Sequence, residues 1–378
     1  MTLVHEFRDY LEFWSKHMIR VEQDKLYPEI SIDNVPNSAA LRGSMYLARI
    51  LYGASKACGT MQTKKYLPLA DKALRELAEF RNPKGGYYWA RANNKEWVHD
   101  AENVCMAQAF VLYGLVEYAL MHPSPEVEEL IKEQFNFIQS VLREEGGTAY
   151  LDGFDAKWEK SDQMTRSFGT HFHVLEALVK YKQYKEVPGL KETIVKLIRL
   201  VIDKFIDPDH FDCIHRFGES WELMPNEIWA GHNAECSWVL CEAALETGHE
   251  ELIEETRNLA ILMMDRVITF GLDKNKGGYF NVLYHEGSRD KSKGWWQQAE
   301  AVLGLLNAYE ITGQNRYKKL AMEQIFFIRD KFICPEGEWY TEVNNDGKPV
   351  IGLPKVSFWK SMYHTVRYYD YVINRLDP

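Results

Sequence analysis

A structural unit of about sixty residues recurs along the whole of this 378-residue chain. Each unit contains two segments in which apolar residues repeat at three- and four-residue spacing, which is typical of α-helices. One helical hairpin cannot bury its inner face alone, so a repeat of this kind indicates an array of packed hairpins. The pattern predicts twelve helices, near residues 5–25, 40–58, 63–80, 102–121, 125–143, 170–184, 190–205, 232–247, 250–269, 295–312, 315–332 and 357–374.

A short motif of glycines and aromatic residues separates most of the helix pairs. Glycine permits the positive φ of a sharp reversal, and the aromatic residues that follow suit a short extended segment. The motif therefore predicts short β-type turns between one hairpin and the next. Its four copies read Gly85-Gly86-Tyr87-Tyr88-Trp89, Gly146-Gly147-Thr148-Ala149-Tyr150, Gly277-Gly278-Tyr279-Phe280 and Gly337-Glu338-Trp339-Tyr340.

The predicted helices alternate in character along the chain. Those near 64–80 and 315–332 carry a wide charged face, which indicates exposure to water. Those near 104–120 and 233–247 are rich in Ala, Gly, Val and Leu around most of their circumference, which indicates enclosure on both sides. No Pro/Gly/Ser-rich or charged linker divides the chain. The sequence thus predicts an all-α fold, a single (α/α)6 toroid over residues 1–378 with the apolar helices inside.

Composition narrows the classes of partner. A net charge of -10 and a pI near 5.7 argue against a nucleic-acid partner. A membrane partner is not expected either, because no run of 18 apolar residues and no signal peptide are recognisable. The six cysteines are scattered without a CxxC pair, which predicts free thiols in a reducing cytoplasm.

Side chains that could take part in catalysis or ligand binding recur in step with the repeat. Equivalent positions of successive units in a closed ring point at the central axis, so these residues should meet in one cavity. A single histidine on a buried helix is most often a hydrogen-bonded core residue, but three at equivalent positions indicate a site. The residues, 59 to 68 positions apart, are Arg49, Tyr113, His173, His232, Trp296 and His364.

Carboxylates follow two of these histidines at three-residue spacing. Glu235 follows His232 and Glu176 follows His173, so each could orient an imidazole and set its tautomer. His171 points away from His173 on the same predicted helix, so only one of the two can face the cavity. We expect His173 to be that residue.

Three kinds of site compete with proton transfer as an interpretation of these residues. A metal site would use histidine ligands, but there is no HExxH motif and no ligand pair at four-residue spacing. Glycoside hydrolysis needs two carboxylates, and Asp155, Asp162, Glu235 and Glu300 are available, but this reaction leaves the histidines unexplained. A sugar-binding toroid without chemistry is the third.

Proton transfer uses the whole set of residues. Two histidines on opposite faces of a sugar carbon could remove a proton from one face and return one to the other. Arg49 beside the carbonyl oxygen could stabilise the developing enolate. Such a reaction requires no cofactor, and the chain has no GxGxxG or P-loop motif. We therefore expect neither a cofactor nor a metal.

At these residues the chain resembles the N-acylglucosamine 2-epimerase superfamily, and within it the cellobiose and mannose 2-epimerase branch. The resemblance runs from about Asn37 to Arg367, nearly the whole chain. Its carriers are the blocks Ala48-Arg49-Ile50-Leu51-Tyr52, Gln108-Ala109-Phe110-Val111-Leu112-Tyr113, Thr170-His171-Phe172-His173-Val174-Leu175-Glu176-Ala177, Gly231-His232-Asn233-Ala234-Glu235-Cys236-Ser237-Trp238, Trp295-Trp296-Gln297-Gln298-Ala299-Glu300 and Trp359-Lys360-Ser361-Met362-Tyr363-His364.

The resemblance implies an (α/α)6 barrel that epimerises a reducing sugar at C2 without a metal. It implies that His232 and His364 transfer the C2 proton, that His173 assists opening of the sugar ring, and that Arg49 lies at the enolate oxygens. The positions that correspond to sugar-contacting residues are Tyr113, Glu235, Trp296, Glu300 and Trp359.

Two departures concern the substrate. Where the cellobiose-acting members carry an asparagine, this chain has Gly169 before Thr170 and Thr365 after His364. The loss of these amides favours a monosaccharide such as mannose or glucose over a β-linked disaccharide.

The leading hypothesis is a sugar 2-epimerase that acts through a cis-enediolate. An aldose–ketose isomerase would use the same residues with reprotonation at C1, and a non-catalytic sugar-binding toroid is a further alternative. Either a monomer or a homodimer is compatible with the sequence.

Overall fold

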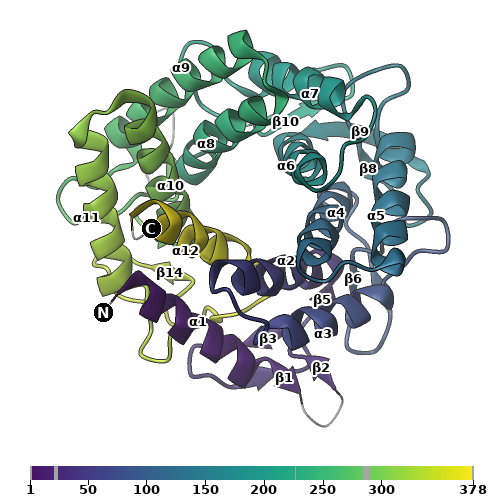
Figure 1. The fold of residues 1–378 in the computed structure, drawn as a ribbon, viewed down its shortest axis with the longest axis horizontal. Coiled ribbons are helices and arrows are strands. Elements are labelled where there is room, and N and C mark those ends of the chain that lie inside the picture. The colour runs from purple at the N-terminus through teal and green to yellow at the C-terminus, as the bar shows by residue number, and fades with distance from the viewer. Residues whose placement is uncertain (1, 21–23, 226, 284–289, 377–378) are drawn as a thin grey trace.

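The protein is a closed double ring of α-helices (Figure 1). The computed structural model describes residues 2–20, 24–225, 227–283 and 290–376, and these contain twelve α-helices. The inner ring consists of α2 (Ser44–Thr60), α4 (Val104–Met121), α6 (Phe168–Tyr184), α8 (Ala230–Thr247), α10 (Trp295–Thr312) and α12 (Met362–Leu376). The outer ring consists of α1 (Leu3–His17), α3 (Leu67–Ala78), α5 (Pro125–Phe137), α7 (Leu190–Phe205), α9 (Glu250–Arg266) and α11 (Asn315–Lys331). The predicted (α/α)6 toroid is therefore confirmed.

The inner helices are enclosed on all sides, as their composition predicts. In α4 every residue from Val104 to Ala119 is buried except Met106, which is partly buried. By contrast, α3 buries one face only, with Leu69, Ala73 and Leu77 turned inward. Burial of apolar area on both sides of the inner ring is the dominant stabilising contribution in a fold of this kind.

Short strands connect each outer helix to the next inner helix. They form six small antiparallel sheets around one end of the ring. The two three-stranded sheets contain β5 (Arg42–Gly43), β6 (Ala90–Arg91) and β7 (Trp97–Val98), and β8 (Asp152–Phe154), β9 (Lys160–Ser167) and β10 (Arg216–Gly218). The two-stranded sheets pair β1 (Ile19–Arg20) with β2 (Lys25–Leu26), β3 (Glu29–Ile30) with β4 (Pro36–Asn37), β11 (Ile228–Trp229) with β12 (Val282–Leu283), and β13 (Lys293–Gly294) with β14 (Glu342–Val343).

The glycine-aromatic motifs form the predicted turns. In each copy a single β-bridge joins a residue shortly after the outer helix to an aromatic residue after the turn, as in Arg81 with Tyr87 and Leu272 with Tyr279. Gly85 has φ 98° and Gly277 has φ 75°, which are conformations that side chains disfavour. A fifth turn of the same kind, with a bridge between Ile206 and Cys213, lies in a segment without the glycines.

Pairing of the first and last helices closes the ring. Phe7 of α1 stacks on Tyr369 of α12 with ring centres 4.9 Å apart. The Trp14 indole N–H donates to the buried carboxylate of Glu338 at 2.6 Å, and Lys360 donates to the same carboxylate at 2.8 Å. Five hairpins are thus continuous in sequence, and the sixth is assembled from the two ends of the described chain.

Several predicted boundaries require correction. The helix expected over 5–25 ends at His17, and two short strands follow it. The helix expected over 357–374 begins at Met362, because the residues before it form an irregular loop at the mouth of the ring. The sequence pattern also missed β9, whose first residues are exposed and lack an apolar face.

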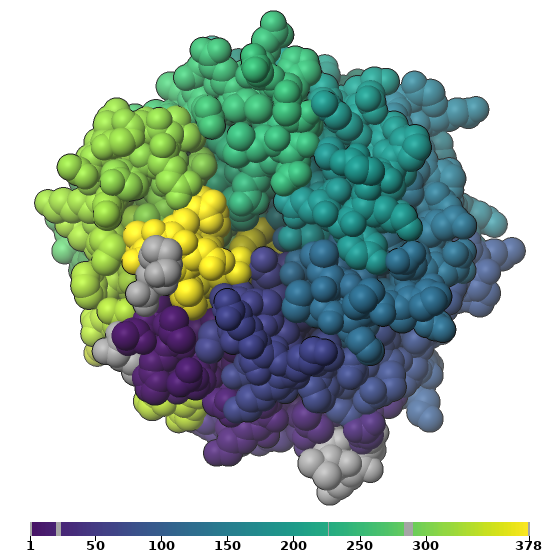
Figure 2. Space-filling view, viewed as in Figure 1, coloured from purple at the N-terminus to yellow at the C-terminus, as the bar shows by residue number. Residues whose placement is uncertain are grey.

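Side chains fill the centre of the ring that the ribbon leaves open (Figure 2). Among the described residues only α4 is long and apolar enough to cross a membrane, and 83% of that stretch is buried inside the ring. All six cysteines lie among the described residues, where they are buried and form no disulfide. The cytoplasmic location stays a prediction.

Replacement of Gly114 by alanine should destabilise the ring, because α2 and α4 cross closely there. A Cβ at Gly114 would lie 2.6 Å from the backbone oxygen of Ala48. Such overpacking costs about 1–3 kcal/mol, which urea denaturation would measure as a lower free energy of unfolding. Gly59→Ala in α2 is the control, since its Cβ would meet only the side chain of Met121, at an ordinary contact distance of 3.7 Å from Sδ. We expect it to be neutral or to stabilise by up to about 1 kcal/mol, and equal effects of the two substitutions would contradict the close crossing.

Candidate active site

A cavity of about 580 Å³ opens at the end of the ring where the inner helices begin. The helix starts converge there, so side chains in their first two turns reach the axis. Its wall includes seven residues that the sequence singled out: Arg49, His173, His232, Glu235, Trp296, Trp359 and His364. Its size lies within the range of roughly 300–1,000 Å³ that is typical of small-molecule sites.

His232 and His364 meet across one indole. The ring centre of Trp296 is 4.8 Å from that of His232 and 5.4 Å from that of His364. Gly231 makes this approach possible, because a Cβ there would lie 2.5 Å from the Trp296 ring. The two histidines, from α8 and α12, therefore face one small volume.

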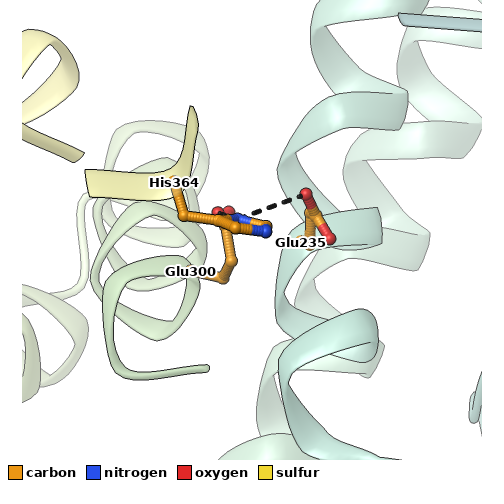
Figure 3. Close-up of side chains that lie close together, drawn as sticks. All are labelled: Glu235, Glu300 and His364. Atoms are coloured by element: carbon orange, nitrogen blue, oxygen red, sulfur yellow. Dashed lines mark hydrogen bonds and ion pairs between the residues drawn. The ribbon is translucent and has the colours of Figure 1, made fainter. Parts of the chain in front are cut away.

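A buried carboxylate holds His364. Its Nδ1 lies 2.7 Å from Glu300 Oε1, and the carboxylate of Glu235 is 3.9 Å away (Figure 3). A carboxylate of this kind accepts, so Nδ1 carries the proton and Nε2 keeps a lone pair. Burial holds the pKa of His364 well below its usual value, although the charge of Glu235 opposes this effect. His364 is thus a neutral base at neutral pH.

His232 is held by another histidine instead. Its Nδ1 lies 2.9 Å from Nε2 of His215. The sequence suggested Glu235 as the partner, but that carboxylate bonds Arg367 on α12. The charged guanidinium competes for it better than a neutral imidazole does. Burial, together with the charges of His215 and then of the neighbouring histidines, lowers the pKa of His232 well below its usual value.

His173 faces the cavity and His171 does not. His173 Nδ1 lies 2.6 Å from Glu176 Oε2, the arrangement that the three-residue spacing predicts. His171 is fully buried, with Nε2 accepting from the Tyr150 N–H at 2.9 Å and Nδ1 2.7 Å from the Ser167 carbonyl oxygen. Burial lowers the pKa of His171 to about 4, so it is a neutral core residue.

Arg49 places a positive charge in the cavity wall. Its guanidinium lies over the ring of Phe110, 4.1 Å from the ring centre, and donates to the Trp359 carbonyl oxygen at 3.1 Å. Burial lowers the pKa of Arg49 to about 10, so the group stays charged at neutral pH. A partly desolvated cation in this position can stabilise negative charge that develops on a bound oxygen.

A second layer of side chains, here called the carboxylate layer, lies one helical turn below the histidines. It comprises Tyr52, Tyr113, Glu176, Glu235, Glu300 and Arg367. Arg367 is its centre: it donates to Glu176 and to Glu300 at 2.6 Å each, and it also bonds Glu235.

Burial opposes the negative charge of all three glutamates in the carboxylate layer. For Glu176, Arg367 and His173 outweigh burial and bring the pKa to about 2. For Glu235 and Glu300, burial prevails and raises the pKa. The single guanidinium of Arg367 is thus the main compensation for three buried carboxylates.

Tyr113 is the one predicted residue that the structure does not bring to the histidines. It lines a second cavity of about 200 Å³, together with Tyr52 and Lys180. Phe110, one turn nearer the start of α4, stands at the level of Arg49 and His173. A repeat whose length varies from 59 to 68 residues does not distinguish positions three residues apart.

The side-chain atoms best placed to ligate a metal already surround the guanidinium of Arg367. Single ligand atoms of Glu235, Glu300 and His364 lie within 4.8 Å of one another. The Arg367 guanidinium bonds both of these carboxylates, and its Nη2 lies 3.5 Å from His364 Nδ1. A metal ion would have to displace this guanidinium.

Sequence reasoning missed His215 and Arg367. His215 lies two residues after a turn bridge, the position that Trp89 and Asp152 occupy in other repeats, so alignment of the turns could have found it. Arg367 lies three residues after His364, and an arginine on an otherwise apolar helix face signals buried carboxylate partners.

Residues 27–367 match the sequence profile of the N-acylglucosamine 2-epimerase (GlcNAc 2-epimerase) family. The chain belongs to that family. It is similar to the cellobiose 2-epimerase of Dictyoglomus turgidum, with 27% identity over 360 residues that cover 92% of this chain and 91% of that protein. Family membership makes it an isomerase of the epimerase class, a sugar 2-epimerase.

Two solved structures share this fold. The cellobiose 2-epimerase of Bacillus thermoamylovorans superimposes with a TM-score of 0.91 at 26% identity, over 99% of this chain and 98% of that one. A D-mannose isomerase superimposes with a TM-score of 0.88 at 17% identity, over 99% of this chain and 97% of that one. The second likeness concerns the fold alone.

Loss of the central guanidinium should destabilise the protein strongly. Arg367→Gln leaves three buried carboxylates without their shared cation, a change of the kind that costs about 3–5 kcal/mol. Chemical denaturation measures the difference. The control is Arg316→Gln, which removes a half-exposed ion pair with Asp265 and should cost at most about 1 kcal/mol. A loss for Arg367→Gln no larger than that of the control would contradict the role of Arg367.

Proposed function

We propose that this chain interconverts a free reducing aldose and its C2 epimer, with His232 and His364 as the two proton-transfer groups. One observation carries the proposal: both imidazoles line one cavity and flank the same indole, and each has its Nδ1 engaged by a partner. Their Nε2 atoms are therefore the ones available to a substrate.

The chemistry follows from these positions. One histidine removes the C2 proton from the open-chain aldehyde, and the electron pair moves toward O1 to give a cis-enediolate. The other histidine, which enters the reaction protonated on Nε2, delivers that proton to the opposite face of C2, so the two imidazoles exchange protonation states in each turnover. Arg49, in the same wall, compensates the negative charge on the enediolate oxygens. These steps need no cofactor and no metal.

The remaining residues of the site fit supporting roles. His173, held by Glu176, is suited to assist opening of the sugar ring. Glu300 and Glu235 hold His364 and Arg367 rather than standing free for the sugar, although Glu235 also reaches the cavity. Because Tyr113 lines the second cavity, we do not propose a substrate contact for it.

The tryptophans of the cavity wall indicate the class of substrate. Trp229, Trp296 and Trp359 line the cavity, and flat aromatic faces suit the apolar faces of sugar rings. Trp359 is 47% exposed at the mouth, where a second sugar ring of a disaccharide could stack. The similar proteins are named cellobiose 2-epimerases. A reducing hexose of the mannose or glucose type is the proposed minimal substrate, and cellobiose is the disaccharide to test beside it.

Removal of either imidazole should abolish most of the turnover. His232→Ala and His364→Ala should each lower kcat by roughly 10²–10⁴-fold, since each deletes one proton-transfer group. The assay follows mannose, glucose and cellobiose by product identity. His210→Ala, at an exposed position, is the control and should keep wild-type turnover.

Product identity also tests the competing functions. Glucose formed from mannose supports epimerisation, whereas fructose would indicate the aldose–ketose isomerase. Turnover of both histidine variants at the wild-type rate would contradict the mechanism. A protein that binds sugar but leaves the C2 hydrogen unexchanged in D2O would be a binding toroid.

The pH profile should extend further into acid than a free histidine allows. A protonated imidazole cannot accept the C2 proton, so kcat/KM falls as pH drops through the pKa of the base. Burial lowers the pKa of both His232 and His364, so the base form persists below the ordinary histidine value of 6.5. We expect the acid limb of kcat/KM below pH 6.5. A limb centred above pH 6.5 would contradict the lowered pKa of the histidine that acts as the base.

A further inference from the structure

Among the histidines of the cavity wall, His173 has the partner that is most firmly ionised. Its Nδ1 lies 2.6 Å from Glu176 Oε2. Glu176 Oε1 accepts from Arg367 at 2.6 Å, and the Tyr363 hydroxyl donates to the same oxygen at 2.7 Å. Burial opposes the charge of Glu176, but Arg367 and His173 outweigh it and bring the pKa of Glu176 to about 2. An ionised carboxylate at this distance stabilises the cationic form of an imidazole.

The two proposed proton-transfer histidines hold a positive charge less well. His364 also bonds a carboxylate, that of Glu300, but Arg367 Nη2 lies 3.5 Å from the same Nδ1 and opposes a positive charge on the ring. His232 Nδ1 bonds an imidazole, which brings no negative charge. Burial, in both cases the largest cause, holds the pKa values of His232 and His364 well below the usual value. Both rings are therefore neutral in the free enzyme at neutral pH.

Epimerisation needs one of these neutral rings to carry a proton on Nε2 when it meets C2. We propose that opening of the sugar ring supplies this proton: His173 protonates the ring oxygen O5, and the O1 proton passes to the imidazole that next acts as the acid at C2. The positive charge thus moves from His173 to His232 or His364 through the sugar. This role of His173 rests on the proposed epimerisation, and it joins ring opening and C2 chemistry in one proton cycle.

Ring opening transfers two protons and creates no net charge. The C1–O5 bond breaks, its electron pair goes to O5, and the Nε2 proton of His173 adds there. The O1–H electron pair forms the C1=O1 double bond, and the O1 proton adds to Nε2 of the acid. His173 is then neutral, the acid is an imidazolium, and the open-chain aldehyde is ready for proton transfer at C2.

The later steps return the protonation of the site to its starting state. The second imidazole of the pair removes the C2 proton to give the enediolate, and the acid delivers its Nε2 proton to the opposite face of C2. On closure the O5 electron pair bonds C1 again, and the O5 proton goes back to His173. O1 takes the proton held by the second imidazole. After each turnover His173 is again cationic and both rings of the pair are neutral.

The positions of the rings fit this cycle. His173, His232 and His364 line one cavity, and Nδ1 of each is bonded to its own partner, so each presents Nε2 to a bound sugar. Arg49 and His173 pack on the same side chain, Phe110, with the guanidinium 4.1 Å and the imidazole 4.4 Å from its ring centre. O1 and O5 are bonded to the same sugar carbon, so a cation for one and a proton donor for the other belong side by side. The charge of Arg49 also favours release of the proton from His173.

The test measures ring opening apart from epimerisation. An aldose released in its open form closes to either anomer, so enzymatic ring opening appears in NMR exchange spectra as anomerisation faster than in buffer. His232→Ala and His364→Ala are each given the two epimers separately. Because the two epimers use opposite imidazoles as the acid, we expect each variant to anomerise one epimer and to lose roughly 10²-fold or more of the rate with the other. The two variants should show opposite preferences, and the retained activity shows that each is folded.

Substitution of the proton source should affect both epimers alike. In His173→Gln the side-chain amide can still donate a hydrogen bond to O5, but it does not release a proton. We expect its anomerisation of both epimers to fall to the rate in buffer. His210→Gln, at an exposed position, is the matched control and should anomerise and epimerise as the wild-type enzyme does.

The outcomes separate this role of His173 from the proposed function. If His232→Ala and His364→Ala treat the two epimers alike, whether both rates are kept or both are lost, the O1 proton does not pass to the acid of the C2 step and the inference is wrong. Wild-type anomerisation by His173→Gln would exclude His173 as the proton source. If the wild-type enzyme anomerises the sugars but neither forms an epimer nor exchanges the C2 hydrogen in D2O, the proposed function fails while ring opening by His173 stands.

Discussion

The cluster of Arg367 and three buried glutamates is the interaction on which the site depends. Glu176, Glu235 and Glu300 come from three inner helices and Arg367 from a fourth, so their ion pairs tie four of the six inner helices together. Two of these carboxylates also hold histidines of the cavity. Buried charges of this kind contribute less to net stability than to a unique arrangement, and a cluster that fixes two imidazoles fits that role.

The repeat pattern predicted most of the fold because the burial of helix faces repeats regularly around the ring. Apolar residues around the whole circumference of helices such as α4 are incompatible with a surface position, and charged faces such as that of α3 are incompatible with the interior. The alternation of the two types therefore predicted the double ring, and the glycine-aromatic motifs predicted the short turns between one hairpin and the next. Helix ends at His17 and Met362 were less predictable, because loop packing rather than periodicity sets them.

Residue-level geometry was predictable only where the helix itself fixes it. Glu176 and His173 contact each other as their spacing indicates, because Arg367 bonds Glu176 Oε1 and leaves Oε2 to His173. Glu235 has the same spacing from His232, yet it turns to Arg367, which is more than a hundred residues away in the chain. Tyr113 and Phe110 differ by one turn, which places Tyr113 at the second cavity and Phe110 beside Arg49 and His173. His215 reaches His232 from a loop, a contact that helical periodicity does not describe.

Closure of the ring by α1 and α12 has a consequence for biosynthesis. α12 follows the other five inner helices in sequence, and it brings both His364 and Arg367. While the ribosome is still making the earlier part of the chain, the glutamates meant for Arg367 have no cation to neutralise them. A nascent chain that contains five hairpins but not yet α12 should therefore form an incomplete ring with a loosely ordered centre. Chemical competence would then arrive in one late step, when the twelfth helix docks between α10 and α2.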